Sequence, residues 1–491
     1  METLKRNGLL FGFVALFIGL NAYFMFQDNY FFNALPLVLI IAYIAIFHTH
    51  TTFLITALLT PLSVNLEGFT EGQIGLFLPT EPILFGLMLL IIFKELKSSI
   101  IDKSFWKHPL TLSVGFYIAW VFLTSITSTN PMVSFKFLLM KLWYIIPLMT
   151  IGFMVFEKKS NIVKFLWCYT IGMSIAIVYT LIRHSGYNFG EKEGHWVMWP
   201  FFKDHTIYGS SVAMSLFFIF GLIAYKKHSI QAQVILAIIL VITLIGLYFS
   251  YTRGAWLSVV FAFGVWVLIK YKIKFKYVLG VGLAALSIII ISWSKIEMEL
   301  AKNKHEHTTT NFDERLRSAA NISSDASNLE RLNRWGAAFN MFKEKPVFGF
   351  GPATYAFEYA PYQDPEKLTI ISTNFGTQGN AHSEYLGPLA EMGLIGMLSV
   401  LVFVAILFYS GVMLLINIKR FTPEEKQMYT LILCVVLAMS TYFFHGLLNN
   451  YLDTDKASVP VYGAAAMIIA QQVRLKRKRI SMHLPDLSKS K

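Results

Sequence analysis

Long apolar stretches recur along almost the whole chain, and no other feature constrains its fold as strongly. Of the 491 residues, 55% are hydrophobic and 14% are charged, and the mean hydropathy is +0.55. In a soluble domain about a quarter of the residues are charged. A helix needs roughly 17 to 25 mostly apolar residues to cross a bilayer, and stretches of that kind follow one another here. The sequence therefore predicts an all-α fold, a polytopic transmembrane helix bundle.

We expect about 12 to 14 of these helices. The first apolar stretch follows Lys5 and Arg6, as in a signal peptide, but it has no clear small-residue cleavage site and another span follows almost at once. We therefore interpret it as a retained helix. The apolar stretches lie near residues 9–26, 31–47, 51–65, 77–94, 109–127, 137–156, 161–182, 207–224, 232–250, 254–270, 277–293, 390–416, 428–447 and 457–472.

Basic residues are grouped into short clusters between the apolar stretches. If the N-terminus is cytoplasmic, alternation of the helices places every cluster and the C-terminus on the cytoplasmic side, as the positive-inside rule requires. The formal net charge of +13 is therefore explained by membrane topology and does not indicate nucleic-acid binding. The clusters are Lys94 to Lys107, Lys158 and Lys159, Lys226 and Lys227, Lys270 to Lys276, Lys419 and Arg420, and Arg474 to Arg479.

The same topology places two longer polar segments, 183–206 and 294–381, on the outer side. Loops as long as the second are usually functional or disordered. Its part 303–328 is polar and charged, whereas 331–362 is rich in aromatic residues, so we expect the latter part to fold. It should contain a short amphipathic helix near Leu329 to Phe342, followed by a Gly/Pro turn.

Five regions follow from this pattern. They are N-terminal transmembrane helices with the first external loop (1–206), further transmembrane helices (207–293), one large external loop (294–381), C-terminal transmembrane helices (382–473) and a basic cytoplasmic tail (474–491).

Three segments carry ionisable residues beside the predicted spans, where a charge is costly, about 2.5 to 3.5 kcal/mol at a helix centre. Arg253, in the segment 249–257, lies at an outer helix boundary and could face a cavity or extend to lipid phosphate. His382 lies where the long loop re-enters the membrane and could be a base or a structural residue. Arg331 and Arg334 lie on the predicted short helix and could bind an anion or be solvated.

Together these segments resemble the O-antigen ligase and polymerase family of bacterial membrane glycosyltransferases. One family pattern is Arg, three residues and Leu; another is His-Asn/Ser, nine residues and Gly-x-x-Gly. The resemblance covers about residues 207–416. The matching residues are Arg253 and Leu257 for the first pattern, His382, Ser383, Gly393 and Gly396 for the second, and 331–335 with 346–352 for the segment between them.

The resemblance implies an enzyme of the bacterial inner membrane whose active site faces the periplasm. The implied donor is a glycan on a polyprenyl (undecaprenyl) pyrophosphate, and the implied acceptor is a hydroxyl of lipid A core or of a growing glycan. His382 would be the base. Arg253 and Arg331 would hold pyrophosphate oxygens, since arginine suits bidentate contacts with them. Membrane lipids are the other expected partners of this enzyme, and no cofactor is expected.

Several further residues are weaker candidates. Glu391 is expected to lie deeper in its helix and to pair with a buried cation. Additional candidates for pyrophosphate binding are Arg334, Lys141 and Arg183. Candidates that would support His382 are Glu384, Ser383 and His445.

Asp453 and Asp455 have the spacing of a metal-binding DxD pair, which is typical of enzymes that use nucleotide-sugars. Nucleotide-sugars are not expected outside the cell. We therefore interpret both aspartates as solvated residues of an external turn. We expect no metal site and a metal-independent reaction that displaces the pyrophosphate directly and inverts the anomeric configuration.

The motifs leave the acceptor open. The chain could be a ligase that uses lipid A core, a polymerase or a protein O-oligosaccharyltransferase; a ligase is the first interpretation because the His-Ser motif and the loop pattern look closest to that branch. A lipid or glycan transporter (flippase) would also have many spans. Transporters usually place charges near the midplane and show repeated halves, whereas here the cations collect at one face and no repeat is evident.

Overall fold

The computed structural model of the protein describes residues 2–27, 31–69, 75–225, 228–292, 326–368, 372, 379–418 and 422–483. The chain divides into two compact units, Met1–Thr52 and Phe53–Lys491. The first unit contains α1 (Glu2–Phe26), η1 (Phe31–Ala34) and α2 (Leu35–Phe47), and α3 (Thr49–Leu59) begins in it. Most of the polar segment predicted at 303–328, and the basic clusters at 226–227 and 419–420, lie outside the described residues.

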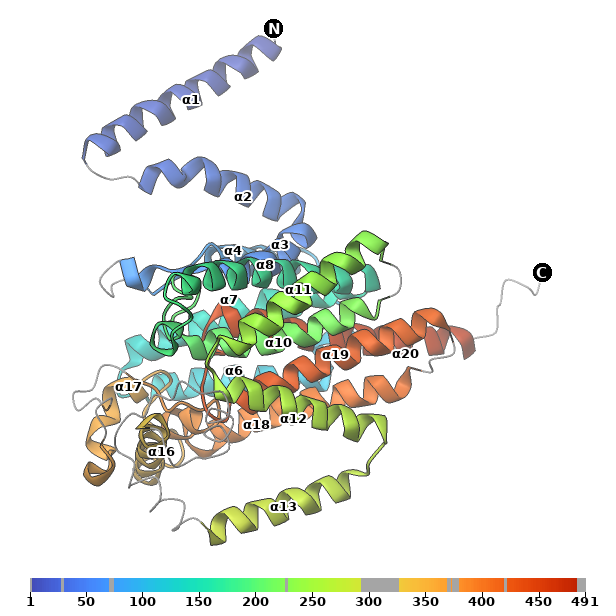
Figure 1. The fold of residues 1–491 in the computed structure, drawn as a ribbon. Coiled ribbons are helices and arrows are strands. Elements are labelled where there is room, and N and C mark those ends of the chain that lie inside the picture. Colours follow the sequence, from blue (N-terminus) through green and yellow to red (C-terminus); the bar gives the residue numbers. More distant parts are fainter. Residues whose placement is uncertain are drawn as a thin grey trace. The chain divides into compact units, whose positions relative to one another are not determined.

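The second unit is built mainly of helices (Figure 1). In its described part, the strands are the short antiparallel pair β1 (Val64–Asn65) and β2 (Phe77–Leu78). After α3 the helices are η2 (Thr60–Leu62), η3 (Leu66–Phe69), α4 (Thr80–Lys97), α5 (Lys103–Trp106), α6 (Pro109–Ile126), α7 (Pro131–Phe156), α8 (Lys159–Ser185), α9 (Glu191–Gly194), α10 (His205–Ile223), α11 (Ile230–Tyr248), α12 (Arg253–Lys270), α13 (Phe275–Ile291), α16 (Ala326–Glu344), α17 (Tyr355–Glu358), η5 (Ala360–Tyr362), η6 (Pro365–Lys367), α18 (Leu386–Asn417), α19 (Pro423–His445) and α20 (Asp455–His483).

The all-α polytopic bundle predicted from the apolar stretches is confirmed. Each stretch that was expected to be helical contains a helix. Within the described residues, eight helices are long and apolar enough to cross a membrane, namely α6, α7, α8, α10, α11, α12, α18 and α19.

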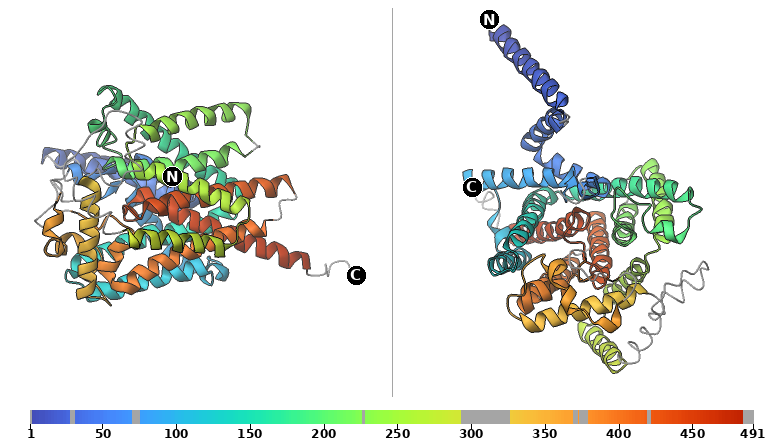
Figure 2. Two further views of the ribbon diagram at one scale, coloured as in Figure 1. Left: turned by 60° about the horizontal axis from the view of Figure 1, so that its bottom comes forward. Right: turned by 90° about the vertical axis from the view of Figure 1, so that its left-hand side faces the viewer.

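Helix α20 lies at the centre of the second unit. It packs against α7, α18 and α19, and in the right-hand view of Figure 2 the red C-terminal helices lie inside a ring of other helices. Its residues 455–470 are all buried. Because protein rather than lipid surrounds this helix, it can carry polar residues that a lipid-facing span would exclude.

The aromatic part of the long loop folds as predicted. Helix α16 includes the amphipathic helix expected near Leu329 to Phe342. Behind it lies a small hydrophobic core to which α18 also contributes through Ala390, so the loop packs directly on a membrane-spanning helix. The buried members of this core are Ala337, Ala338, Met341, Phe350, Tyr355, Tyr359, Ala381 and Ala390.

The Gly/Pro turn at 346–352 docks on a break in α18. Gly393 has φ +68° and ψ −168° inside this helix, which interrupts the regular hydrogen bonding of its backbone. The turn supplies the missing partners for the backbone groups beside the break. Phe350 N donates to Ala390 O at 3.2 Å, Gly351 N donates to Glu391 O at 2.7 Å, and Leu394 N donates to Pro346 O at 3.0 Å.

Two glycines allow this contact between the turn and α18. A Cβ atom at Gly393 would overlap the carbonyl oxygen of Val347, and a Cβ atom at Gly349, whose φ is +67°, would overlap the backbone of Glu391. Both positions also have a left-handed backbone that strains other residues. Gly393, the first glycine of the Gly-x-x-Gly pattern after His382, therefore serves the docking of the long loop.

Replacement of Gly393 by alanine should destabilise the protein. The added methyl group would overlap the loop backbone, and the combination of positive φ and extended ψ, which is nearly restricted to glycine, costs another residue about 1–3 kcal/mol. We expect Gly393→Ala to lower the melting temperature of the detergent-solubilised protein by several degrees, measured by tryptophan fluorescence. The control is Gly264→Ala in α12, where nothing lies within 4 Å of an added Cβ. Equal melting temperatures for the two variants would contradict this account of the break.

Candidate active site

Helix ends from distant parts of the chain meet at one end of the second unit. Helices α10, α12, α18 and α20 begin there, whereas α8 and α19 end there. The connections are joined by hydrogen bonds: Thr252 Oγ1 donates to His205 O at 2.7 Å, and Glu384 N donates to Gly446 O at 2.8 Å. The tertiary structure therefore gathers segments that carry the predicted functional residues.

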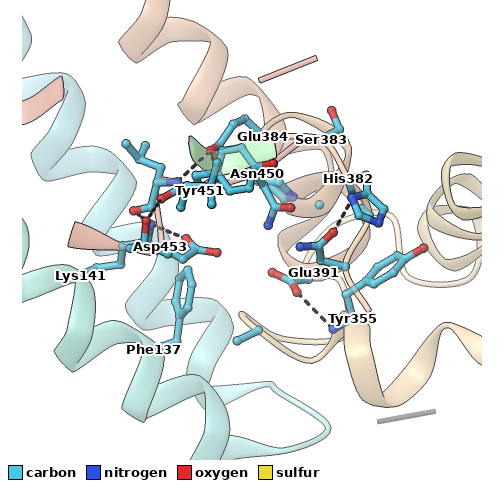
Figure 3. Close-up of a pocket in the computed structure, with 18 of the residues that line it drawn as sticks. Phe137, Lys141, Tyr355, His382, Ser383, Glu384, Glu391, Asn450, Tyr451 and Asp453 are labelled. Atoms are coloured by element: carbon cyan, nitrogen blue, oxygen red, sulfur yellow. Dashed lines mark hydrogen bonds and ion pairs between the residues drawn. The ribbon is translucent and has the colours of Figure 1, made fainter. Parts of the chain in front are cut away.

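A cavity of about 920 Å³ lies among these helix ends. Figure 3 shows His382 on one side of it and Lys141 with Asp453 on the other. Arg334 also lines it, as do residues of β2, the segment 202–204 and the segment 450–454. Of the described residues predicted to bind pyrophosphate, Arg334 and Lys141 line the cavity, whereas Arg253, Arg331 and Arg183 do not.

The backbone before α18 sets the position of His382. His382 has φ +46°, and its amide donates to Asn380 Oδ1 at 3.0 Å. The next residue, Ser383, accepts hydrogen bonds on Oγ from the amides of Tyr385 and Leu386, each at 3.3 Å. Ser383 therefore caps the first turn of α18, where amide groups have no partner within the helix.

Asn449 connects His382 to the segment that carries Arg253. The side chain of Asn449 is hydrogen-bonded to the His382 imidazole, and its Nδ2 lies 3.0 Å from Nε2 of His445. A Cβ atom added at Gly254 would lie 3.2 Å from the His445 imidazole, so this ring packs against the start of α12. The structure thus brings His445 close to both motifs.

The two arginines of α16 influence the protonation of His382. Burial, together with the charges of Arg334 and Arg331, lowers the pKa of His382 to about 3. At physiological pH the imidazole is therefore neutral and able to accept a proton. The structure therefore brings Arg331 and Arg334 close enough to His382 for their charges to act on it.

Arg334 is firmly held at the edge of the cavity. Its Nε donates to Glu330 Oε1 at 2.7 Å, and its Nη1 donates to Asn380 O at 3.1 Å. The guanidinium also lies over the ring of Tyr359, 5.3 Å from its centre. These contacts fix a cation beside the residues that precede His382.

Lys141 and Arg183 lie in different surroundings. Lys141 is buried and forms an ion pair with Asp453 at 2.6 Å across the cavity from His382 (Figure 3). Arg183 is stacked on Trp196, with its guanidinium 5.1 Å from the ring centre, and donates to backbone carbonyls of the first external loop. Their predicted roles in pyrophosphate binding stay predictions.

Glu384 joins the start of α18 to the connection between α19 and α20. Its Oε1 accepts hydrogen bonds from the Tyr442 hydroxyl at 2.5 Å, the Tyr451 amide at 2.7 Å and the Leu452 amide at 2.8 Å. Burial raises the pKa of Glu384, while the charge of Lys141 opposes that shift. Its contacts show how Glu384 can position His382, which lies two residues before it in the chain.

Glu391 and the two aspartates of the DxD pattern are held by internal contacts. Glu391 lines the cavity and accepts the Tyr355 amide on Oε1 at 3.1 Å. Asp455 accepts hydrogen bonds from two buried hydroxyl groups of the α3–α4 region, and it is fully buried. The interpretation of Asp455 as a solvated turn residue is therefore wrong, because this residue begins the central helix α20 and α20 is enclosed by protein.

Two residues at this site were missed by sequence reasoning. Asp204 lines the cavity and caps α10, since its Oδ1 accepts the amides of Thr206 at 2.7 Å and Ile207 at 3.1 Å. The N-cap signature of Asp204 could be read in the sequence. Asn449 had no local signal, because its importance comes from its contact with His382, which is distant in the sequence.

Comparison with known proteins is consistent with the motifs. Residues 237–401 match the model of the O-antigen ligase family. The matched region runs from α11 into α18 and therefore includes Arg253, Arg331 and His382. The family resemblance predicted from these segments is confirmed. No curated protein matches the chain.

Removal of the Glu384 carboxylate should destabilise the site. In Glu384→Ala, the hydroxyl of Tyr442 and the amides of Tyr451 and Leu452 lose their acceptor, at a cost of about 1–3 kcal/mol for each buried donor that stays unsatisfied. We expect a clearly lower melting temperature and a smaller loss for Glu384→Gln, which retains an acceptor oxygen. Glu366→Gln, at an exposed position outside the cavity, is the control. If Glu384→Ala melts like the control, the carboxylate does not hold this connection.

Proposed function

We propose that this protein, whose residues 237–401 match the O-antigen ligase family, transfers a glycan from a polyprenyl pyrophosphate to an acceptor hydroxyl at the outer face of the bacterial inner membrane. The observation that carries the proposal is a neutral histidine, His382, at a large cavity and beside two arginines, within the segment that matches the family. An O-antigen ligase is our first choice within this family. A polymerase or a protein O-oligosaccharyltransferase would use the same groups.

The chemistry needs one base and a site for the departing anion. His382 accepts the proton of the acceptor hydroxyl as that oxygen bonds to the anomeric carbon of the donor sugar. The bond from this carbon to the pyrophosphate oxygen breaks, and polyprenyl pyrophosphate leaves with the electron pair. Because the acceptor attacks from the side opposite the leaving group, a single displacement inverts the anomeric configuration.

The arginine side chains and the helix N-termini at this end of the unit suit the binding of the departing polyprenyl pyrophosphate. The charge of Arg331 acts on the pKa of His382. Arg253 is the first residue of α12, and the residue after it, Gly254, packs against His445. Helices α10, α12, α18 and α20 begin at this end of the unit, and helix N-termini carry partial positive charge that favours anions. Arginines fixed before the reaction stabilise the charge that develops on the pyrophosphate.

Binding of the donor should make His382 a better base. A pKa of about 3 keeps the imidazole neutral but makes it a weak proton acceptor. The negative charge of the pyrophosphate would offset Arg331 and Arg334, so the pKa of His382 rises when the donor is bound. The site therefore couples donor binding to activation of the acceptor.

Reconstituted transfer tests the function directly. The protein in proteoliposomes is supplied with an undecaprenyl pyrophosphate glycan and a panel of acceptors, and the product is measured by mass spectrometry. We expect His382→Ala and Arg253→Ala each to lower the transfer rate at least 100-fold, in line with the loss of a base or of a charge-stabilising group. Arg477→Ala, at the far end of α20, is the control. Transfer that survives in both variants at the wild-type rate would refute the assignment.

The same assay tests the stereochemistry and the expected metal independence. The new glycosidic bond should have the configuration opposite to that in the donor, which nuclear magnetic resonance of the product reports. Addition of EDTA should leave the rate unchanged. Net retention, or complete loss of activity in EDTA that a divalent ion restores, would contradict single displacement without a metal.

The pH dependence should differ between the free and donor-bound enzyme. The value of kcat/KM for the donor reports free enzyme, in which the lowered pKa keeps His382 neutral, so kcat/KM should not fall between pH 8 and pH 5 through protonation of this residue. The value of kcat reports the complex, so kcat should begin to fall at a higher pH than kcat/KM. This electrostatic account would be contradicted if kcat/KM fell with a midpoint near pH 6.5 and the midpoint were the same in the wild type and in Arg331→Gln.

A further inference from the structure

The cationic side chains that line the cavity are accompanied by a similar number of acidic ones. Its described lining contains four cationic side chains and five acidic ones. A site built for a polyanion collects cations without matching acids. The cations are Lys141, Lys203, Arg334 and Lys456, and the acids are Glu67, Asp204, Glu384, Glu391 and Asp453.

Each of these cations already has a partner in the protein. Lys141 pairs with Asp453 at 2.6 Å, and Arg334 pairs with Glu330 at 2.7 Å. Lys203 lies 3.7 Å from Glu67 at the exposed rim. A phosphate group entering the cavity would therefore meet three cations that are already paired with carboxylates of the protein.

Lys456, at the buried end of the cavity, is also fully hydrogen-bonded within the protein. Its Nζ donates to the carbonyls of Thr60 at 2.6 Å and Ser63 at 2.8 Å and to the Ser63 hydroxyl at 2.6 Å. These three acceptors use all three donors of the ammonium group. Lys456 therefore has no N–H donor left for a phosphate.

The remaining lining suits an uncharged, hydroxyl-rich molecule. Phenylalanine rings at 77, 137 and 202 line the cavity together with Asn65 and Asn450, and each ring has a lysine ammonium group over one of its faces. The faces of aromatic rings carry negative potential and attract the slightly positive C–H groups of a sugar ring, while amides and carboxylates bond its hydroxyls. A volume of about 920 Å³ is near the upper end of the roughly 300–1,000 Å³ of ligand pockets, enough for several sugar rings.

We propose that this cavity binds the acceptor and that it selects an uncharged saccharide over a phosphorylated one. The inference rests on the proposed function, in which the acceptor hydroxyl must reach His382, and His382 lines the cavity whereas Arg253 and Arg331 do not. Phosphate groups of the donor are held by those arginines outside the cavity. The part of the acceptor that enters the cavity is thus a stretch of sugars without phosphate, whether it belongs to a core glycolipid or to a growing glycan.

Binding without the donor tests this selectivity separately from catalysis. The full-length protein in nanodiscs is titrated by calorimetry with uncharged tetrasaccharides of glucose, galactose and N-acetylglucosamine, each matched with its 6-phosphate. We expect at least one uncharged tetrasaccharide to bind tenfold or more tightly than its phosphate. Equal or tighter binding of every phosphate, or no binding of any uncharged tetrasaccharide, overturns the proposal.

Variants locate the selectivity in the cavity. Glu67→Gln removes the partner of Lys203 at the rim, where the side chains are 46% and 73% exposed, so folding should be preserved. We expect it to narrow the preference for the uncharged tetrasaccharide at least threefold, whereas Glu366→Gln outside the cavity should leave it unchanged. If the two variants behave alike, the cavity does not determine the preference.

The two proposals can fail separately. Loss of transfer in the reconstituted system with tight, selective saccharide binding would refute the transferase and leave a saccharide-binding cavity. Normal transfer that depends on His382, but to acceptors phosphorylated within that stretch of sugars as well as to neutral ones, would refute the selectivity alone.

Discussion

The hydrogen bonds of the Glu384 carboxylate hold the candidate site together. This single side chain, two residues after His382, accepts hydrogen bonds from the hydroxyl of Tyr442 and the amides of Tyr451 and Leu452. The start of α18 is thereby fixed to the connection between the two central helices α19 and α20. Inside a membrane protein, a buried amide without an acceptor costs more than the net value of a hydrogen bond. The acceptor therefore cannot be lost without moving the backbone on which His382 lies.

A second constraint is the close approach of the long loop to α18. The break at Gly393 leaves backbone N–H and C=O groups of α18 without partners inside the helix, and the turn at 346–352 forms hydrogen bonds with them. The same docking places α16, with Arg331 and Arg334, against the segment that leads to His382. The glycines of the His motif and the arginines of the loop thus belong to one structural arrangement, although about sixty residues separate them in the chain.

Charge pairing gives this site its chemical character. Within the cavity the cations are matched by acids or saturated by backbone acceptors, whereas Arg331 lies outside it and acts on His382 through its charge. In the two proposals, the anion and the saccharide bind in neighbouring but different regions. His382 lies where the two regions meet, which is where proton transfer to a base has to occur in the proposed displacement.

The sequence by itself determined the helices, because lipid demands apolar stretches of a certain length, and it determined the three motifs of the family. It also identified His382, Arg331 and Arg334, whose residue types suit a base and anion-binding groups. Only the tertiary structure showed that Asn449 joins His382 to His445, and that Asp455 is buried. These facts depend on contacts between helix ends far apart in the chain. Local patterns of hydrophobicity cannot specify such contacts, since they are decided by how the helices pack.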